Sequence, residues 1–168
     1  STTKISNGAF YNCTNLETVE MGNSVATIGK GAFYKCKALT AIQLPDTLKK
    51  IESEAFYNCA SLTSLVVPTS VKSIGQYAFY CCDNLATASI GSSVVEVGAS
   101  AFESCPKLKF TCNKDSATEK YAIANIFAVA IANTFDNPVR DFAGATVIFA
   151  ILLYSAQQYA DFSGGIDM

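Results

Sequence analysis

The chain has 168 residues, of which 50% are apolar and 15% are charged, and its formal net charge is −2. This length allows one ordinary domain, or a small domain with an appendage. It contains no histidine, which excludes Ser-His and Cys-His catalytic pairs and every metal site that uses histidine. No run of lysine or arginine provides the basic patch that nucleic acid needs, so we expect no nucleic-acid partner.

The first two thirds of the chain repeat the motif Ala-Phe-x-x-Cys five times, at a constant spacing of 23 residues. The phenylalanines are Phe10, Phe33, Phe56, Phe79 and Phe102, and the cysteines are Cys13, Cys36, Cys59, Cys82 and Cys105. A fixed period of this length is typical of a solenoid, in which each repeat forms one coil and stacked coils bury a common core. We therefore predict five coils, which we number by their phenylalanine.

Within each repeat, a leucine six positions after the phenylalanine begins an L-x-x-L-x-L pattern. This pattern predicts one short strand per coil. A turn residue follows it at Gly22, Pro45, Pro68 and Gly91. A second aliphatic position returns to the core at Ile5, Ile28, Ile51, Ile74 and Val97. In the fifth coil the pattern weakens, because Thr111 and Asn113 fall where the other coils carry apolar residues.

Five of the seven cysteines occupy one position of the repeat, which favours buried free thiols over a disulfide framework or a zinc site. No C-x-x-C pair is present, and the adjacent Cys81 and Cys82 suit neither a tetrahedral site nor an ordinary disulfide. We expect no metal and no cofactor. A core of reduced thiols is typical of a reducing compartment.

The stretches AFYNCTNLETVEMGNSVATIGKGAF and AFYKCKALTAIQLPDTLKKI resemble BspA-like leucine-rich repeats, in register from residue 1 to about 113. The following stretch CNKDSATEKYAIANIF, to about residue 127, resembles the helical segment that closes such arrays. The resemblance implies a leucine-rich-repeat solenoid with a parallel sheet on one face. It also implies a surface-exposed binding or adhesion protein without catalytic residues. The rest of the chain resembles nothing in that family.

The x positions of the strand pattern are the first candidate contact surface. These are Thr18, Glu20, Ala41, Gln43, Ser64, Val66, Thr87 and Ser89, which we call the sheet face. Their side chains are small and mostly neutral, and they lack the Trp, Tyr and Arg that dominate binding hot spots. Plain exposure to solvent is therefore the alternative to a protein contact.

The second candidate is an aromatic patch of four tyrosines that directly follow the phenylalanines. They are Tyr11, Tyr34, Tyr57 and Tyr80, which we call the tyrosine ladder, and Glu103 takes their place in coil 5. Such rings stabilise the packing of coil on coil, and they also offer a contact patch.

The remaining chain predicts two helices and a three-part organisation. Ser116 and Glu119 form a capping box for a helix that begins near residue 117. We assign residues 1–113 to the solenoid, 114–135 to a helical capping segment, and 136–168 to a hydrophobic helix with a short tail. Asn137 and Pro138 provide the start of that second helix.

The second helix has 19 uncharged residues between two aspartates, which gives a length of about 28 Å. This is close to the roughly 30 Å hydrocarbon core of a bilayer. The candidate membrane residues are Val147, Ile148, Phe149, Ile151, Leu152, Leu153 and Tyr154. The alternative is a helix that docks on the solenoid as ordinary core.

We predict a non-enzymatic protein-interaction or scaffold subunit, attached to a membrane or a membrane complex through residues 138–160. Its solenoid would lie on the reducing side, in the cytoplasm or inside an organelle, and its partners would be protein subunits. The alternative is a secreted or cell-surface adhesion or ligand-binding protein whose tail helix is capping core. No paired carboxylates and no glycine-rich phosphate loop suggest an enzyme.

Overall fold

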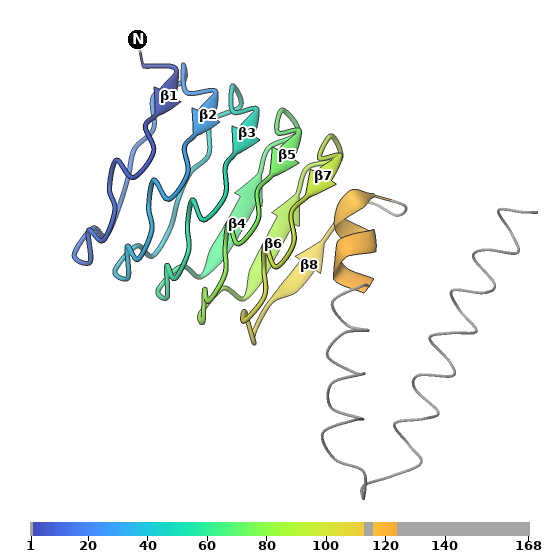
Figure 1. Ribbon diagram of the computed structural model, residues 1–168. Coiled ribbons are helices and arrows are strands. Elements are labelled where there is room, and N and C mark those ends of the chain that lie inside the picture. Colours follow the sequence, from blue (N-terminus) through green and yellow to red (C-terminus); the bar gives the residue numbers. More distant parts are fainter. Residues whose placement is uncertain (1, 113–115, 124–168) are drawn as a thin grey trace, which may run out of the picture. The chain divides into compact units, whose positions relative to one another are not determined.

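The computed structural model describes residues 2–112 and 116–123. Five coils stack side by side as a parallel β-solenoid, one coil for each 23-residue repeat (Figure 1). Each coil returns beside its own starting point one repeat later, so that Ile5 pairs with Ile28 and Ile28 with Ile51. The leucine-rich-repeat solenoid predicted from the repeat is confirmed.

The coils form two parallel sheets. The five-stranded sheet contains β1 (Lys4–Ile5), β2 (Thr27–Ile28), β3 (Lys50–Ile51), β5 (Ser73–Ile74) and β7 (Glu96–Val97), in that order. The three-stranded sheet contains β4 (Ser64–Val67), β6 (Thr87–Ile90) and β8 (Lys109–Thr111). The L-x-x-L-x-L pattern thus becomes a strand in coils 3 to 5, whereas the equivalent segments of coils 1 and 2 are not strands.

The five-stranded sheet was not predicted from the sequence. Each of its strands is two residues long, which is too short for an alternation of apolar and polar residues to be visible in the sequence. The aliphatic residue of each strand was predicted only as part of the core, and Ile28, Ile51 and Ile74 are indeed buried. Pairing of these short strands follows from the constant repeat length, which places equivalent residues of neighbouring coils side by side.

The phenylalanines of the repeat stack through the middle of the core. Phe33, Phe56 and Phe79 are fully buried, and neighbouring ring centroids lie 5.0–5.1 Å apart. Phe10, in coil 1, remains 36% exposed. The core is therefore most completely closed around the central coils.

Each buried cysteine donates its thiol to the backbone of the preceding coil. Cys36 Sγ lies 3.1 Å from the carbonyl oxygen of Phe10, and Cys59 Sγ lies 3.2 Å from that of Phe33. The prediction of buried free thiols is confirmed for Cys36, Cys59 and Cys82, whereas Cys13 is exposed and Cys105 partly exposed. The cysteine of the motif thus combines a small apolar volume with a weak hydrogen-bond donor.

Two positions in every coil have the left-handed backbone conformation. The position two residues before the phenylalanine is Gly8 and Gly31 in coils 1 and 2, with φ of 63° and 59°, but Glu54, Tyr77 and Ser100 in the later coils. The position two residues after it is Asn12, Lys35, Asn58, Cys81 and Ser104, with φ between 55° and 59°. A side chain other than glycine costs roughly 1–2 kcal/mol in this conformation. The tight corners of the coil therefore impose the left-handed conformation even on residues that disfavour it.

Hydrogen bonds between coils run in two opposite directions. In the Phe-Cys segment, an N–H donates to a carbonyl of the following coil, as from Phe33 to Ala55 at 2.7 Å. Beside the strands, an N–H donates to the preceding coil, as from Gly75 to Ile51 at 2.8 Å. Stacking therefore satisfies backbone groups on both sides of each coil.

The last coil is one residue shorter than the others at its strand. Lys109 pairs with Thr87, an offset of 22 residues, so that Phe110 takes the inward place of Ala88. The prediction that Thr111 occupies an apolar position was wrong, because Thr111 is exposed and Phe110 packs edge-on against Phe102 at 5.1 Å. This shift restores an apolar residue to the core at the end of the array.

A helix over residues 117–123 follows the last coil, as predicted (Figure 1). The Ser116 hydroxyl accepts a hydrogen bond from the Glu119 N–H at 3.1 Å, which confirms the N-cap. The Tyr121 hydroxyl accepts a hydrogen bond from the Phe102 N–H at 3.0 Å. In the preceding coil the equivalent N–H, that of Phe79, donates to the carbonyl of Ala101. Tyr121 therefore supplies the acceptor that a further coil would provide.

In the part of the chain that the structure describes, no helix has the length and apolar character needed to span a bilayer. The predicted hydrophobic helix, including the candidate membrane residues 147–154, lies outside the described residues. The same holds for most of the segments predicted at 114–135 and 136–168, so their boundaries stay predictions.

Candidate interaction surfaces

The sheet face is exposed along four coils. All eight of its residues are exposed, and Val66 is 65% exposed. Register places Ser64 beside Thr87 and Val66 beside Ser89 on neighbouring strands β4 and β6. Among residues 2–112 and 116–123, none of these eight side chains makes a hydrogen bond or an ion pair. The face therefore offers short side chains whose polar groups are free for a partner.

The tyrosine ladder is a stack of rings at the spacing of the coils. Ring centroids of Tyr11 and Tyr34 lie 4.7 Å apart, those of Tyr34 and Tyr57 4.7 Å, and those of Tyr57 and Tyr80 5.1 Å. Tyr77 adds an edge-on contact with Tyr80 at 5.5 Å. Tyr11 is 58% exposed, and the other three are partly exposed. The rings thus already contact one another, which is the structural role predicted for them.

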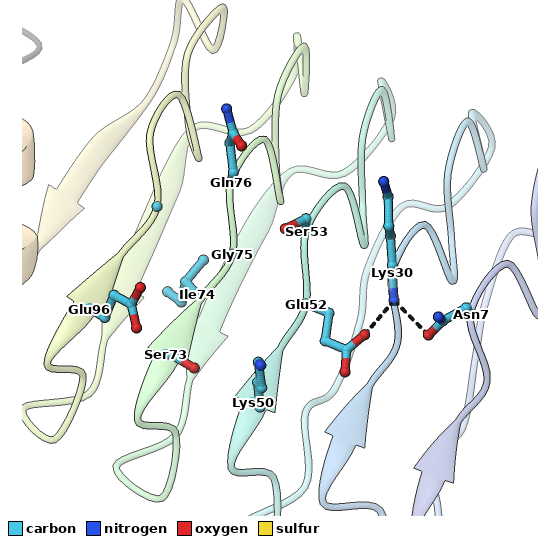
Figure 2. Close-up of a pocket in the computed structure, with 11 residues that line it drawn as sticks. Asn7, Lys30, Lys50, Glu52, Ser53, Ser73, Ile74, Gly75, Gln76 and Glu96 are labelled. Carbon is cyan, nitrogen blue, oxygen red and sulfur yellow. Dashed lines mark hydrogen bonds between the residues drawn. The ribbon is translucent and has the colours of Figure 1, made fainter.

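A third surface, a polar groove on the five-stranded sheet, was not predicted from the sequence (Figure 2). Its volume is about 530 Å³. Its polar lining consists of Asn7, Lys30, Lys50, Glu52, Ser53, Ser73, Gln76 and Glu96. These residues flank the core isoleucines of the short strands, so the second sheet had to be recognised before its outer face could be described.

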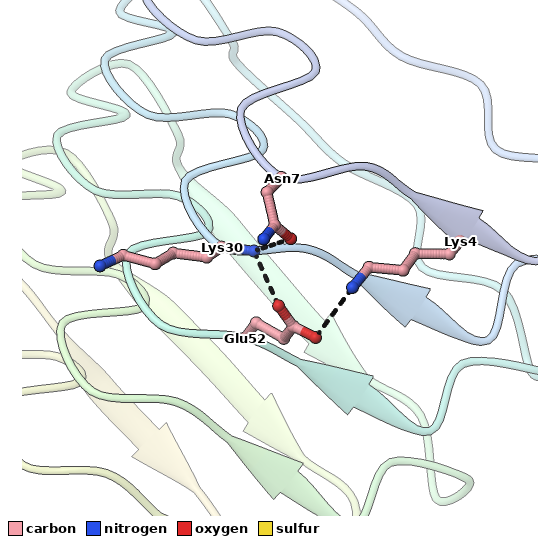
Figure 3. Close-up of polar contacts among 4 residues, drawn as sticks. All are labelled: Lys4, Asn7, Lys30 and Glu52. Carbon is pink, nitrogen blue, oxygen red and sulfur yellow. Dashed lines mark hydrogen bonds and ion pairs between the residues drawn. The ribbon is translucent and has the colours of Figure 1, made fainter.

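Within this groove the carboxylate of Glu52 is held by groups of the chain itself (Figure 3). One carboxylate oxygen lies 3.2 Å from Lys4 Nζ, two coils away. The other accepts a hydrogen bond from the Lys30 N–H at 3.0 Å, and the same N–H is 3.1 Å from Asn7 Oδ1. Lys30 Nζ pairs with Glu54 at 3.4 Å. Charges in this part of the groove are therefore already satisfied within the chain.

The buried cysteines Cys36 and Cys59 lack the features of a reactive or metal-binding site. Burial raises the pKa of Cys36 from 9.0 to about 11, and it raises the pKa of Cys59 further. A thiol with a raised pKa is a poor nucleophile and a poor metal ligand at neutral pH. No group of three or more His, Cys, Asp or Glu residues in the described part of the chain is placed to hold a metal ion.

The structure has five stacked coils whose leucines point into a common core, and short side chains are exposed on the sheet. These features define a leucine-rich-repeat protein. The family model of the BspA type leucine-rich repeat region (6 copies) matches residues 3–127. The chain belongs to this family. None of the curated proteins compared with the chain matches it.

Several solved structures share the fold. The leucine-rich repeat protein TpLRR of T. pallidum is 40% identical, with a TM-score of 0.62 over 63% of this chain and 50% of its own. A leucine-rich repeat protein of Bacteroides ovatus is 33% identical, with a TM-score of 0.63 over 67% of this chain and 29% of its own. The pneumococcal vaccine antigen PcpA, at 24% identity and a TM-score of 0.57, shows the fold alone. The chain thus spans half or less of the length of these proteins.

Proposed function

We propose that this chain is a recognition module of a surface-exposed protein, and that it binds a protein partner through the sheet face. The observation that carries the proposal is the exposure of all eight sheet-face residues without any internal polar contact. Membership of the BspA type family supports an interaction role, because the resemblance implies surface-exposed binding and adhesion proteins. No catalytic role is proposed for any residue.

The tyrosine ladder and the Glu52 end of the polar groove are less available to a partner. Rings of the tyrosine ladder stack on each other, and Glu52 is held by Lys4 and the Lys30 N–H. Binding there would compete with contacts that the solenoid already makes. On the sheet face a partner would displace water and no contact that the described residues make.

The size and chemistry of the sheet face favour a weak contact for a module of five coils. The four coils of the face at about 4.8 Å each and five residues at about 3.3 Å give an area on the order of 300 Å². A stable interface buries about 800 Å² on each partner, more than twice as much. The face also lacks aromatic and arginine anchors, so the partner would supply the hot spots. A partner that contacts this face alone would therefore bind transiently, and a longer array would bind more firmly.

Substitution of the sheet face tests this function. Val66→Arg combined with Ser89→Arg places two long cations side by side on this face, because these residues are register partners on neighbouring strands. Val95→Arg is the matched control, since Val95 is 75% exposed and lies outside the face. Purified chain would be immobilised and exposed to surface proteins extracted from the source cells, and bound proteins would be identified by mass spectrometry.

We expect a protein that is retained by the unmodified chain and by Val95→Arg, and lost with the double variant. Equal retention by all three chains would contradict the sheet-face proposal. Loss with Tyr34→Ala, while the double variant still binds, would assign the contact to the tyrosine ladder.

We also propose that residues 138–160 attach the chain to a membrane, which the apolar composition of this segment supports. The earlier prediction places the solenoid on the reducing side, whereas family membership favours the cell surface. Carbonate extraction of membranes from the source cells tests the attachment. The chain should stay in the pellet, and deletion of 137–168 should release it; release of the intact chain would exclude an integral anchor.

A further inference from the structure

Glu52 shows how this solenoid holds a carboxylate on its five-stranded sheet. Its carboxylate lies between a cation of coil 1, Lys4 Nζ at 3.2 Å, and a backbone donor of coil 2, the Lys30 N–H at 3.0 Å (Figure 3). Asn7 Oδ1 accepts a second hydrogen bond from the same N–H, at 3.1 Å. The Lys4 ammonium and the Lys30 N–H thus form a cradle around one carboxylate, and the Asn7 side chain shares the backbone donor.

The same cradle recurs two repeats, or 46 residues, further along the chain, but without its carboxylate. The equivalents of Lys4, Asn7, Lys30 and Glu52 are Lys50, Ser53, Gln76 and Gly98. Lysine is kept, serine replaces asparagine, and the backbone N–H is present at Gln76. Glycine replaces glutamate, so no internal carboxylate reaches the second cradle. The Gly98 backbone packs closely on the preceding coil, where a Cβ would collide with the Gln76 nitrogen.

The donors of the second cradle have no partner of their own. Within residues 2–112 and 116–123, Lys50 forms no ion pair and the Gln76 N–H donates no hydrogen bond. Both residues line the polar groove beside Gly98, and their side chains are exposed (Figure 2). The second cradle therefore opens to solvent, where the first is filled from within.

We propose that Lys50, Ser53 and the Gln76 N–H bind a carboxylate from an aspartate or glutamate of a protein partner. Ammonium and backbone donors around one carboxylate form charge-assisted hydrogen bonds, which are stronger than neutral ones. The site lies on the five-stranded sheet, apart from the sheet face, and goes beyond the function proposed above. An acidic side chain here would take the place that Glu52 takes in the first cradle.

Glu96 limits the affinity of the second cradle. It is the register equivalent of Lys50, two strands away across Ser73, and it lines the same groove. Its negative charge opposes an incoming carboxylate, whereas the corresponding residue of the first cradle is Lys50 itself. We therefore expect an isolated carboxylate to bind weakly, because exposed ion pairs contribute little.

The test is a titration of the full chain with N-acetyl-glutamic acid methylamide, followed by the backbone amide signals in ¹H–¹⁵N NMR spectra at low salt. We expect the Gln76 amide to shift in a saturable way and the neutral N-acetyl-glutamine methylamide to leave it in place. Lys50→Gln should weaken binding about 3- to 10-fold, and Glu96→Gln should tighten it about 2- to 5-fold. Lys109→Gln is the matched control, because it removes the same charge from the other sheet.

A second variant, Glu52→Gly, empties the first cradle and places there the residue that coils 2, 4 and 5 already carry. We expect the Lys30 amide to join the Gln76 amide in responding to the probe. No selective shift at Gln76, or equal affinity of Lys50→Gln and Lys109→Gln, would overturn the proposal, as would a silent Lys30 amide in Glu52→Gly. Val66→Arg with Ser89→Arg should not alter this titration, so failure of one proposal does not decide the other.

Discussion

Replacement of Phe56 by alanine tests whether the repeat phenylalanine is the centre of the core. Phe56 is fully buried, and its ring stacks on Phe33 at 5.1 Å and on Phe79 at 5.0 Å. Removal of a buried phenylalanine ring costs about 3–5 kcal/mol, which includes the cavity that remains. Because neighbouring coils hold the cavity open from both sides, we expect a loss at the upper part of this range.

Phe10→Ala is the matched control, since the same residue type stands at the same position of coil 1. It is 36% exposed, and within the described part of the chain it stacks on a single ring, that of Phe33 at 5.1 Å. Partial burial of a phenylalanine stabilises by about 1–2 kcal/mol, so we expect a loss of that size. The comparison separates burial from residue type.

The assay is urea unfolding followed by circular dichroism, with the free energy of unfolding extrapolated to water. Equal slopes in urea would show that each variant unfolds as the parent does. A loss below about 1 kcal/mol for Phe56→Ala would refute the assignment of this phenylalanine to the core. Equal losses for both variants would refute the difference in burial between coils 1 and 3.

Four further predictions concern the cap, a corner and the thiols. Tyr121→Phe should lower the free energy of unfolding by about 1–3 kcal/mol in the same urea assay, because the Phe102 N–H loses its acceptor; no change would mean that water replaces the hydroxyl. Cys81→Asn should raise it by about 0.5–1 kcal/mol, because asparagine tolerates the left-handed conformation found at φ 55°; a loss would show that the Cys81 side chain stabilises the coil. In native thiol labelling at pH 8, exposed Cys13 should react first and buried Cys36 only on unfolding, and comparable rates would contradict the burial. Burial raises the pKa of Cys36 from 9.0 to about 11, so its contribution to the free energy of unfolding should be intact below pH 9 and fall between pH 9 and 11. Cys36→Ala should reduce this fall.

The features that could be predicted from the sequence are those that repeat in every coil. Phe56, Leu62 and Cys59 recur at fixed positions, and a residue that recurs every 23 positions stacks on its equivalents once the coils form. Exposure of the sheet face followed from the same argument. The direction of each thiol, toward a phenylalanine carbonyl of the preceding coil, depends on backbone geometry that the pattern does not contain.

Apart from the five-stranded sheet and the direction of the thiols, the features that escaped prediction belong to single coils. Glu52 contacts residues 22 and 48 positions away, and no local pattern marks this pairing. The register of β8 changes by one residue, which only the burial of Phe110 explains. Glu54 and Tyr77 adopt positive φ without a glycine, since their neighbours in the stack impose the corner. Long-range contacts therefore decide the details that distinguish one coil from the next.

The opposed hydrogen bonds between coils affect the electrostatics of the whole array. In an α-helix all peptide dipoles add, and the ends carry about half a unit charge that attracts ions. Here the dipoles of the Phe-Cys segment, as from Phe33 to Ala55, point against those beside the strands, as from Gly75 to Ile51. The two contributions oppose each other along the axis, as strand dipoles do in sheets. Lengthening the array by further coils thus adds binding surface without building up charge at its ends.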